Sequence, residues 1–186
     1  MRERVLIVVL ILVAFALLVS PSIKLLFSQP SFEPAINSKI ENVSSEDYPT
    51  AQIPLEGFIQ ANISVDAILI DRAQVSLRAG CYVIEATTDA CVANAIRKAI
   101  EQKVEFRPTV YDVIVDAFRN FGIRVLGVKI VEIRDNTFIG QLIVQQRDKV
   151  LVLDVRPSDA TAIALRAKAP IYINETLAKE VGKYIC

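Results

Sequence analysis

Four polar side chains lie close together between residues 154 and 159. They are Asp154, Arg156, Ser158 and Asp159. Carboxylates bind cations and transfer protons, and a guanidinium binds anionic oxygens through paired hydrogen bonds. A hydroxyl next to the first free amides of a helix adds a place where an anion can bind. This combination makes residues 154–159 the best candidate site of the chain.

An expected strand and an expected helix position these four residues. Residues 151–155 are apolar apart from Asp154, which predicts a buried strand with one carboxylate in it. Pro157 ends the strand, because the residue before a proline avoids helical angles and proline itself fits the first helical turn. Ser158 is expected to cap the helix, and Asp159 then lies in the first turn, where the helix dipole favours negative charge. The four side chains should therefore meet at one strand-to-helix corner.

The pattern from Gly57 onward predicts an α+β domain with antiparallel or mixed sheets and about four helices. Alternating apolar and polar residues predict the strands. These cover residues 59–69, 73–77, 81–86, 123–133, 137–146, 150–155 and 171–173. Arg134, Asp135 and Asn136 should form the turn of a hairpin, because asparagine tolerates a left-handed backbone.

Apolar residues spaced three and four apart predict the helices. The first is expected to be capped by Thr87 or Thr88, and the last by Asn174, with Leu177 and Val181 facing inward. A helix after the Arg-Pro-Thr segment has one apolar stripe that should face the core. Its members are Val110, Val113, Ile114, Ala117, Phe118 and Phe121. The opposite face carries three charged residues that are predicted to be solvated, namely Asp112, Asp116 and Arg119.

Two short segments repeat the same order of features. Residues 83–90 and 153–160 align without a gap, and each runs from a strand through a hydroxyl residue and Asp-Ala into a helix of small residues. This order suggests a duplicated unit of three strands and a helix. A simpler interpretation is that Thr88-Asp89 and Ser158-Asp159 are both good helix starts.

The first 27 residues differ from the rest of the chain. An uninterrupted apolar run, Val5–Val19, follows Arg2 and Arg4. It is short for a membrane span of about 20 residues but can extend through Ile23, and it also suits a cleavable signal peptide. A proline directly after Ser20 would spoil cleavage there, and a retained single-pass anchor is the favoured interpretation. Arg2 and Arg4 before the run then predict a cytoplasmic N-terminus and an extracytoplasmic domain. Secretion after signal cleavage is the alternative.

A change of composition separates this segment from the domain. Residues 28–56 are rich in Pro, Ser, Asn and Glu and show no sustained period, which predicts a linker. The expected division is therefore a membrane anchor or signal segment at 1–27, a linker at 28–56 and a folded domain at 57–186.

The composition excludes several classes of site. The chain has no histidine, which removes catalytic triads that depend on an imidazole and argues against a Cys-His metal site. Its three cysteines form no CxxC pair, and Cys81 and Cys91 are interpreted as small apolar core residues. From Gly57 onward, 17 basic and 15 acidic residues give the domain a net charge of only +2. The domain therefore lacks the overall positive charge of a strong nucleic-acid binder, which leaves room only for a local basic patch.

Several segments together follow the pattern of a known family. They are Arg-Pro-Thr at 107–109 with Tyr-Asp-Val-Ile at 111–114 and Phe-Gly at 121–122, Arg-Asp-Asn-Thr-Phe at 134–138, Asp-Val-Arg-Pro-Ser-Asp-Ala at 154–160, and Ala-Pro-Ile-Tyr-Ile at 169–173. With them, the stretch from Gly57 to Gly182 resembles the bifunctional nuclease (BFN) domain family. The resemblance implies a compact, often dimeric α+β domain, of a family in which some members degrade both DNA and RNA and others are uncharacterised. Where the family often has His-Asp, this chain has Tyr111-Asp112.

The resemblance gives the candidate residues a chemistry. Hydrolysis of a phosphodiester needs a nucleophilic water, neutralised phosphoryl charge and usually a divalent cation held by carboxylates. In the resulting hypothesis Asp154 and Asp159 hold Mg²⁺ or Mn²⁺, and Arg156 clamps a phosphate. Ser158 and the amides after it would bind the same anion.

Two alternatives accompany this hypothesis. If the repeated unit is a true duplication, Glu85 and Asp89 would supply a second pair of metal-binding carboxylates. Conversely, a salt bridge from Arg156 to Asp154 or Asp159 could only lock the corner. In that case the chain fits a function of another class, a non-catalytic dimeric binding or scaffold module at the membrane surface.

Overall fold

One mixed sheet carries the fold of residues 48–186, which are the residues that the computed structural model describes. Its strands are β1 (Phe58–Ile68), β2 (Arg72–Ala79), β3 (Tyr82–Asp89), β4 (Ile123–Arg134), β5 (Thr137–Gln146), β6 (Lys149–Val155), β7 (Ile171–Asn174) and β8 (Lys183–Tyr184). They lie in the order β6-β5-β4-β7-β1-β2-β3-β8. In this range β4 and β7 run parallel, and the other neighbours run antiparallel. The predicted α+β class with a mixed sheet is confirmed.

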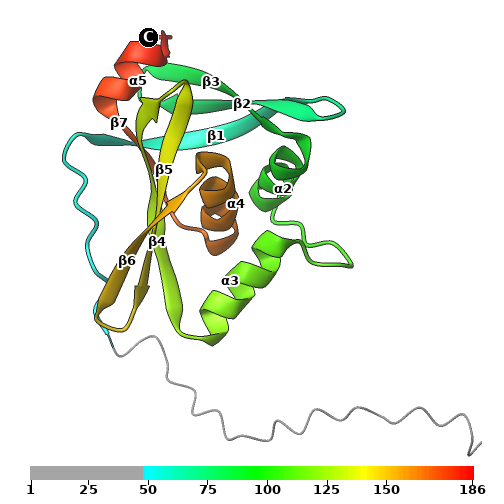
Figure 1. Cartoon of the computed structure of the whole chain (residues 1–186), viewed down its shortest axis with the longest axis vertical. Coiled ribbons are helices and arrows are strands. Elements are labelled where there is room, and N and C mark those ends of the chain that lie inside the picture. Colours follow the sequence, from blue (N-terminus) through cyan, green and yellow to red (C-terminus); the bar gives the residue numbers. More distant parts are fainter. Residues whose placement is uncertain (1–47) are drawn as a thin grey trace, which may run out of the picture. The chain divides into compact units, whose positions relative to one another are not determined.

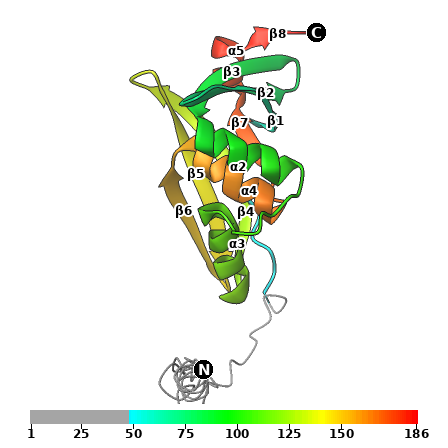
Figure 2. The ribbon, with the colours of Figure 1, turned by 90° about the vertical axis from the view of Figure 1, so that its right-hand side faces the viewer.

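The described range also contains four helices, as predicted. They are α2 (Ala90–Ile100), α3 (Val110–Asn120), α4 (Pro157–Ala167) and α5 (Glu175–Val181). Figure 1 shows β1–β3 and β4–β6 as two groups of strands that run in different directions, with α4 between them. In Figure 2, α2, α3 and α4 lie on the same side of the sheet, whereas α5 lies at the end of the molecule near β3. Because α2 and α3 both pack on α4, α4 is the central helix.

Helix α4 can occupy this central place because its inner positions are small. Ala160, Ala162 and Ala164 are fully buried, and Thr161 is almost fully buried. Small side chains let the helix approach the sheet and its neighbouring helices closely, while larger residues fill the space around it. Those larger core residues include Ile84, Val128, Leu142 and Ile173.

The β4–β5 hairpin forms as predicted. Asp135 and Asn136 both have left-handed backbone angles, with φ values of 48° and 58°. Two such residues form the tight turn whose twist matches that of the flanking strands. The turn pairs Arg134 with Thr137 and places the hairpin tip near the start of α4.

Strand β6 lies at the edge of the sheet, so the prediction that residues 151–155 form a buried strand is wrong. Leu151 and Val152 are 56% and 55% exposed. Among the strands of residues 48–186, β6 pairs only with β5, because β7 inserts between β4 and β1 instead of continuing the sheet beside β6. A continuous apolar run is typical of buried strands, but it does not report which strands will flank it.

The buried face of helix α3 matches the predicted one only in part, with Ile114 and Phe118 packed inward as expected. Val110, Val113 and Phe121 are exposed, although the apolar stripe places them in the core. Asp112 is buried, although the pattern places it on a solvated face, because it pairs with Arg166 of α4. The residues of α3 that do pack inward are Tyr111, Ile114, Val115 and Phe118. The face of α3 that packs on α4 therefore includes a buried ion pair, Asp112 with Arg166.

The two helices that start at the candidate site do not use the expected caps. Strand β3 continues to Asp89, so Thr87 and Thr88 belong to the strand and Asp89 is the N-cap of α2. Arg156 is the N-cap of α4, so Ser158 lies inside the helix. Neither N-cap side chain accepts a hydrogen bond from its own helix. The side chains of Asp89 and Arg156 are therefore free of a capping role and can contact groups outside their own helices.

The last helix begins as predicted. Asn174 Oδ1 accepts a hydrogen bond from the amide of Leu177 at 3.1 Å. Leu177 is buried, but Val181, which was expected to face inward, is exposed at the end of the helix.

A disulfide joins Cys81 to Cys186, so the interpretation of Cys81 as a core thiol is wrong. The bond links the start of β3 to a residue 105 positions later in the sequence, where β8 pairs with β3. Cys91 is free and exposed on α2, which contradicts its expected burial. Cysteines so far apart give no spacing signal in the sequence.

The described end of the predicted linker lies along the sheet. The Ala51 amide donates to Gln145 Oε1 at 2.9 Å, and Gln145 Nε2 donates to the Pro49 carbonyl at 2.9 Å. The predicted anchor at 1–27 and the linker up to residue 47 lie outside the described residues. From Tyr48 onward, no helix is both long and apolar enough to cross a membrane.

Candidate functional site

Arg156 connects the two segments that repeat each other in the sequence. Its Nε donates to Asp159 Oδ2 at 2.6 Å, and its Nη1 donates to Asp89 Oδ2 at 3.0 Å. Asp159 lies in the first turn of α4, whereas Asp89 ends β3 and is the N-cap of α2. Two carboxylates from separate strand-to-helix corners therefore share one guanidinium.

The packing of α2 on α4 brings these corners together. Val92 and Ile96 of α2 form one buried cluster with Ala162 of α4. The alanine permits a close approach of the two helices, and both helices start beside Arg156. Adjacent helix starts favour negative charge, which suits carboxylates at both positions.

Tyr111 of α3 adds a third helix to this group. Its hydroxyl donates to Asp159 Oδ1 at 2.6 Å, so both oxygens of that carboxylate are engaged. Burial raises the pKa of Tyr111, and the hydrogen bond to Asp159 raises it further. The hydroxyl therefore keeps its proton at neutral pH and acts as a donor, not as a phenolate nucleophile. Arg156, Asp89, Asp159 and Tyr111 are called the Arg156 cluster.

Sequence reasoning missed Tyr111 as a site residue. The signal was its position, because the family resemblance puts a histidine there. A tyrosine donates a hydrogen bond as an imidazole can, but it does not gain a proton near neutral pH. At this position the chain therefore supplies a fixed donor to Asp159.

Arg156 presents its charge to solvent. Its side chain is 63% exposed. Hydrogen bonds to Asp159 and then to Asp89 raise the pKa of Arg156, so the guanidinium stays a cation. Its Nη2 makes no hydrogen bond to any residue in 48–186. This nitrogen can therefore donate to an anionic ligand.

A cleft of about 500 Å³ opens beside Arg156. Its polar rim includes Arg72, Asp89, Asn136 and Ser158, so it draws on β2, β3, the β4–β5 turn and α4. Its inner wall is apolar and includes Ile84, Ile96 and Phe138. The arrangement offers polar and cationic contacts at the entrance and an apolar interior.

Asp154 and Glu85 lie apart from this cleft. Val155 packs against the core and side chains alternate along a strand, so Asp154 points to the other face of the sheet. Glu85 is exposed and accepts a hydrogen bond from Gln74 Nε2 at 3.2 Å. The structure thus brings Arg156, Ser158, Asp159 and Asp89 to one place but does not bring Asp154 or Glu85 there.

The carboxylates of the cluster are engaged with Arg156 and Tyr111. Asp159 uses both oxygens and Asp89 uses one. No group of three or more His, Cys, Asp or Glu side chains in residues 48–186 is placed to hold a metal ion. Because Asp154 faces away, these residues do not fit the predicted pairing of Asp154 and Asp159 on Mg²⁺ or Mn²⁺. The guanidinium is the cation that these carboxylates contact.

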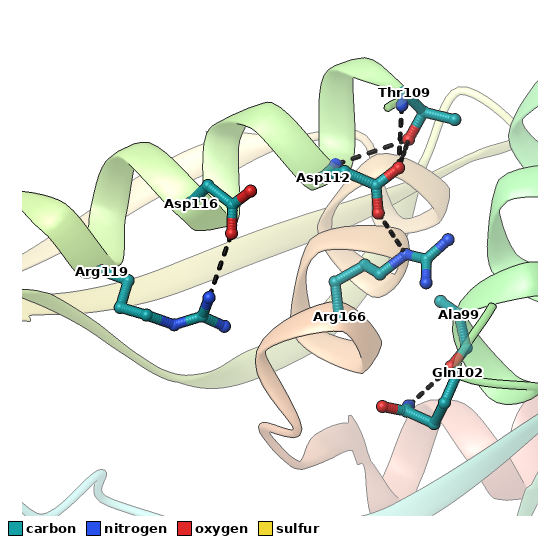
Figure 3. A network of polar contacts seen from close by, with 7 residues as sticks. All are labelled: Ala99, Gln102, Thr109, Asp112, Asp116, Arg119 and Arg166. Atoms are coloured by element: carbon teal, nitrogen blue, oxygen red, sulfur yellow. Dashed lines mark hydrogen bonds and ion pairs between the residues drawn. The ribbon is translucent and has the colours of Figure 1, made fainter. Parts of the chain in front are cut away.

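A second ion pair lies at the other end of α4 (Figure 3). Arg166 Nε lies 2.8 Å from Asp112 Oδ1, and the two side chains are 8% and 6% exposed. Asp112 Oδ2 also accepts hydrogen bonds from the amide and the hydroxyl of Thr109. The Asp112 amide in turn donates to the Thr109 hydroxyl, which completes a capping box for α3. Further along α3, Asp116 and Arg119 form an exposed pair at 3.0 Å, as predicted for a solvated face.

The buried pair holds the first turn of α3 against the last turn of α4. Nε and Nη2 of Arg166 are buried without a well-aligned hydrogen bond within the described part of the chain, so charge attraction is the main contact. Tyr111 directly precedes Asp112 in the same turn. The buried pair therefore helps to keep Tyr111 within reach of Asp159.

Comparisons with known proteins point to one family. The family model described as the bifunctional nuclease domain matches residues 78–185, which is more than half of the chain. An uncharacterized protein of Mycobacterium tuberculosis is 38% identical over 79 residues, which cover 42% of this chain and 46% of that protein. Bifunctional nuclease 1 of Oryza sativa subsp. japonica and bifunctional nuclease 2 of Arabidopsis thaliana are each 33% identical over 79 residues, covering 41% of this chain and 24% of each relative. The match thus spans less than half the length of these curated relatives.

Proposed function

Since this chain belongs to the bifunctional nuclease domain family, we propose that it hydrolyses the phosphodiester bonds of DNA and RNA. The observation that carries the proposal is the exposed guanidinium of Arg156, which is held between two carboxylates at the rim of a cleft. Two plant relatives are named bifunctional nucleases, which supports this choice of reaction.

Arg156 is the residue proposed to bind the phosphate. Charge accumulates on the phosphoryl oxygens during hydrolysis, and a guanidinium that is already oriented stabilises that charge. Asp159 orients Nε of Arg156, and Tyr111 orients Asp159, so these two act as positioning residues. Ser158 lines the same cleft and is proposed to donate its hydroxyl to the phosphate.

Asp89 is the proposed general base. One of its oxygens contacts Arg156, and the other makes no hydrogen bond to residues 48–186, so it can accept a proton from water. The oxygen of that water attacks phosphorus, and the bond from phosphorus to the leaving oxygen breaks. The leaving oxygen takes its proton from solvent. No histidine is needed for this sequence of steps.

A cleavage assay with the purified full-length chain on single-stranded DNA and RNA tests the proposal. Arg156→Ala and Asp89→Asn are expected to lower the rate by about 100-fold or more, because each removes a group that acts in the transition state. Arg119→Ala and Asp116→Asn change the exposed pair on α3 and should keep the wild-type rate. Equal rates in all five identically purified preparations would indicate a contaminant and overturn the proposal.

The same assay also tests the predicted cation dependence and the alternative of a non-catalytic binding module. A rate that a chelator abolishes and that Mg²⁺ or Mn²⁺ restores would support the predicted cation dependence, whereas an unchanged rate would refute it. A chain that binds DNA or RNA but cleaves neither would instead be the non-catalytic binding module that is the alternative to a nuclease.

We also propose that the domain lies outside the cytoplasm, held by the anchor predicted at 1–27. The Cys81–Cys186 disulfide supports this location, because thiols in the cytosol are kept reduced. Protease added to intact cells should then degrade the domain, and the mass of the mature chain should include residues 1–27. A shorter mature chain would instead indicate secretion after signal cleavage.

We further propose that the domain contains a duplicated unit and that it forms a homodimer. Asp89 and Asp159 occupy equivalent positions of the two repeated segments, and both bind Arg156, which supports a duplicated unit. The homodimer expected from the family resemblance is testable by sedimentation of the purified chain, where a monomer mass at micromolar concentration would contradict it.

A further inference from the structure

The cleft beside Arg156 is larger and more apolar than a phosphate requires. Its volume of about 500 Å³ falls within the range of about 300–1,000 Å³ that is usual for small-molecule sites. Its inner wall is aliphatic apart from one aromatic ring, that of Phe138 on β5. A phosphate gains nothing from an apolar wall, since it is charged and strongly hydrated. The wall therefore suits a different part of the substrate.

We infer that the cleft takes one nucleobase of a single-stranded or unpaired nucleotide, stacked on Phe138, while an adjacent phosphate binds Arg156. The inference rests on the proposed function for its substrate class, nucleic acid. A base fits this wall because it is flat and every base has a face that stacks on an aromatic ring. A base inside a duplex is already stacked on both faces and cannot enter.

Arg72 extends the cationic rim around the cleft. It lies directly opposite Asp89 in the β2–β3 register, and it lines the same cleft as Arg156. Its contact with Asp71 is long, at 3.5 Å, and both side chains are exposed, so this pair is weak. Two arginines on the rim therefore match the two phosphates that flank an inserted nucleotide.

The hairpin tip supplies polar groups to the lining of the cleft. Asn136 lines the cleft from a left-handed turn position, and its amide can both donate and accept hydrogen bonds. One amide on an exposed turn discriminates weakly between bases, whereas stacking accepts all of them. The cleft should therefore bind nucleotides with little sequence preference, in agreement with a reaction on both DNA and RNA.

Binding, rather than cleavage, tests the inference. The full-length chain is titrated with a short fluorescent single strand and with a strand of equal length that lacks all bases, and anisotropy gives both dissociation constants. Gel analysis confirms that each strand remains intact. Loss of one stacked base is expected to weaken binding about 5- to 150-fold. Equal affinity of the wild-type chain for the two strands would overturn the inference.

Phe138→Leu removes the aromatic ring but keeps an apolar side chain of similar size, a change that cores often tolerate. This variant should bind both strands within about threefold of each other, because the stacking surface is gone. Phe121→Leu, at the exposed C-cap of α3, is the matched control and should keep the full preference for bases. A Phe138→Leu chain that folds and keeps the full preference would contradict the assignment.

Competition on the wild-type chain decides the case if Phe138→Leu fails to fold. Uncharged nucleosides should displace the strand, whereas ribose should not. Displacement by phenyl phosphate as strong as by a nucleoside monophosphate would overturn the inference in favour of a pocket for apolar phosphate esters. A chain that prefers bases but cleaves nothing refutes only the nuclease, and a chain that cleaves but ignores bases refutes only the base pocket.

Discussion

Helix α4 carries one arginine near each end, and the two differ in burial. Arg156 at the N-cap is 63% exposed, whereas Arg166 in the last turn is 8% exposed. Arg156 pairs with Asp89 at the start of α2, and Arg166 pairs with Asp112 in the first turn of α3. Each arginine thus forms an ion pair with an aspartate at the start of another helix, but one pair is exposed and the other is buried.

Burial decides what each pair can do. Removal of one partner from a buried pair leaves an uncompensated charge in the core, whereas an exposed pair contributes at most about 1 kcal/mol. Arg156 can exchange an aspartate contact for an anionic ligand with little loss of stability, but Arg166 cannot. The comparison favours a structural role for Arg166 and a ligand-binding role for Arg156.

The largest effect is expected from Arg166→Met. This change leaves the carboxylate of Asp112 buried without a countercharge, so the free energy of unfolding should fall by about 3–5 kcal/mol. Denaturation of the full-length chain in urea measures this change.

The exposed pair on α3 provides the control for this variant. Arg119→Met should change the free energy of unfolding by no more than about 0.5 kcal/mol. Adding Asp112→Asn to Arg166→Met should recover part of the loss, because no buried charge remains. An Arg166→Met chain as stable as the wild type would show that the pair does not hold α3 to α4.

Arg156→Lys is expected to have a smaller effect, on the cleavage rate and not on stability. Lysine keeps the charge but lacks the planar fork that contacts Asp159 and Asp89 together. The cleavage rate kcat/KM should fall about 10-fold, while the free energy of unfolding changes by less than about 1 kcal/mol. A variant that lost stability and kept its rate would reverse the roles that the comparison gives to the two arginines.

The two pairs also show how far the sequence could predict this site. Arg156 and Asp159 are three positions apart on one helix, and the hairpin turn at Asp135-Asn136 depends on two neighbouring residues. Both features are local. Residue type and spacing predicted the turn, and they offered a salt bridge from Arg156 to Asp154 or Asp159 as one of two alternatives. The repeated segment likewise indicated Asp89, since it aligns with Asp159.

The misplaced residues depend on contacts between distant parts of the chain. Asp112 appeared to lie on a solvated face until α4 placed Arg166 opposite it, and Asp154 appeared buried until β7 left β6 at the edge. Tyr111 joined the site through a contact to Asp159 from another helix. No local spacing carries such information, because it arises from the order of strands and the packing of helices.

The capping box separates the contribution of the α3 start from that of the buried ion pair. Thr109→Ala removes the hydroxyl that bonds the Asp112 carboxylate and amide, and it leaves Arg166 in place. The free energy of unfolding should fall by about 1 kcal/mol, less than for Arg166→Met. Thr109→Ser keeps the hydroxyl and should restore most of this loss in the same urea titration. A loss as large as that of Arg166→Met would mean that the cap, not the ion pair, holds the helix start.

An effect as small as that of Thr109→Ala is expected from Tyr111→Phe, which tests the link between the two ends of α4. At neutral pH the variant loses one hydrogen bond to Asp159, so the free energy of unfolding should fall by about 0.5–1.5 kcal/mol. The pKa of Tyr111 is raised in the folded chain, so the unfolded chain releases this proton first, near pH 10. The stabilising contribution is thus complete below about pH 10 and declines as pH rises above it, where the gap between wild type and variant should narrow. Urea titrations on both sides of that pH measure the gap, and one that widened with rising pH would contradict a protonated Tyr111 donor at Asp159.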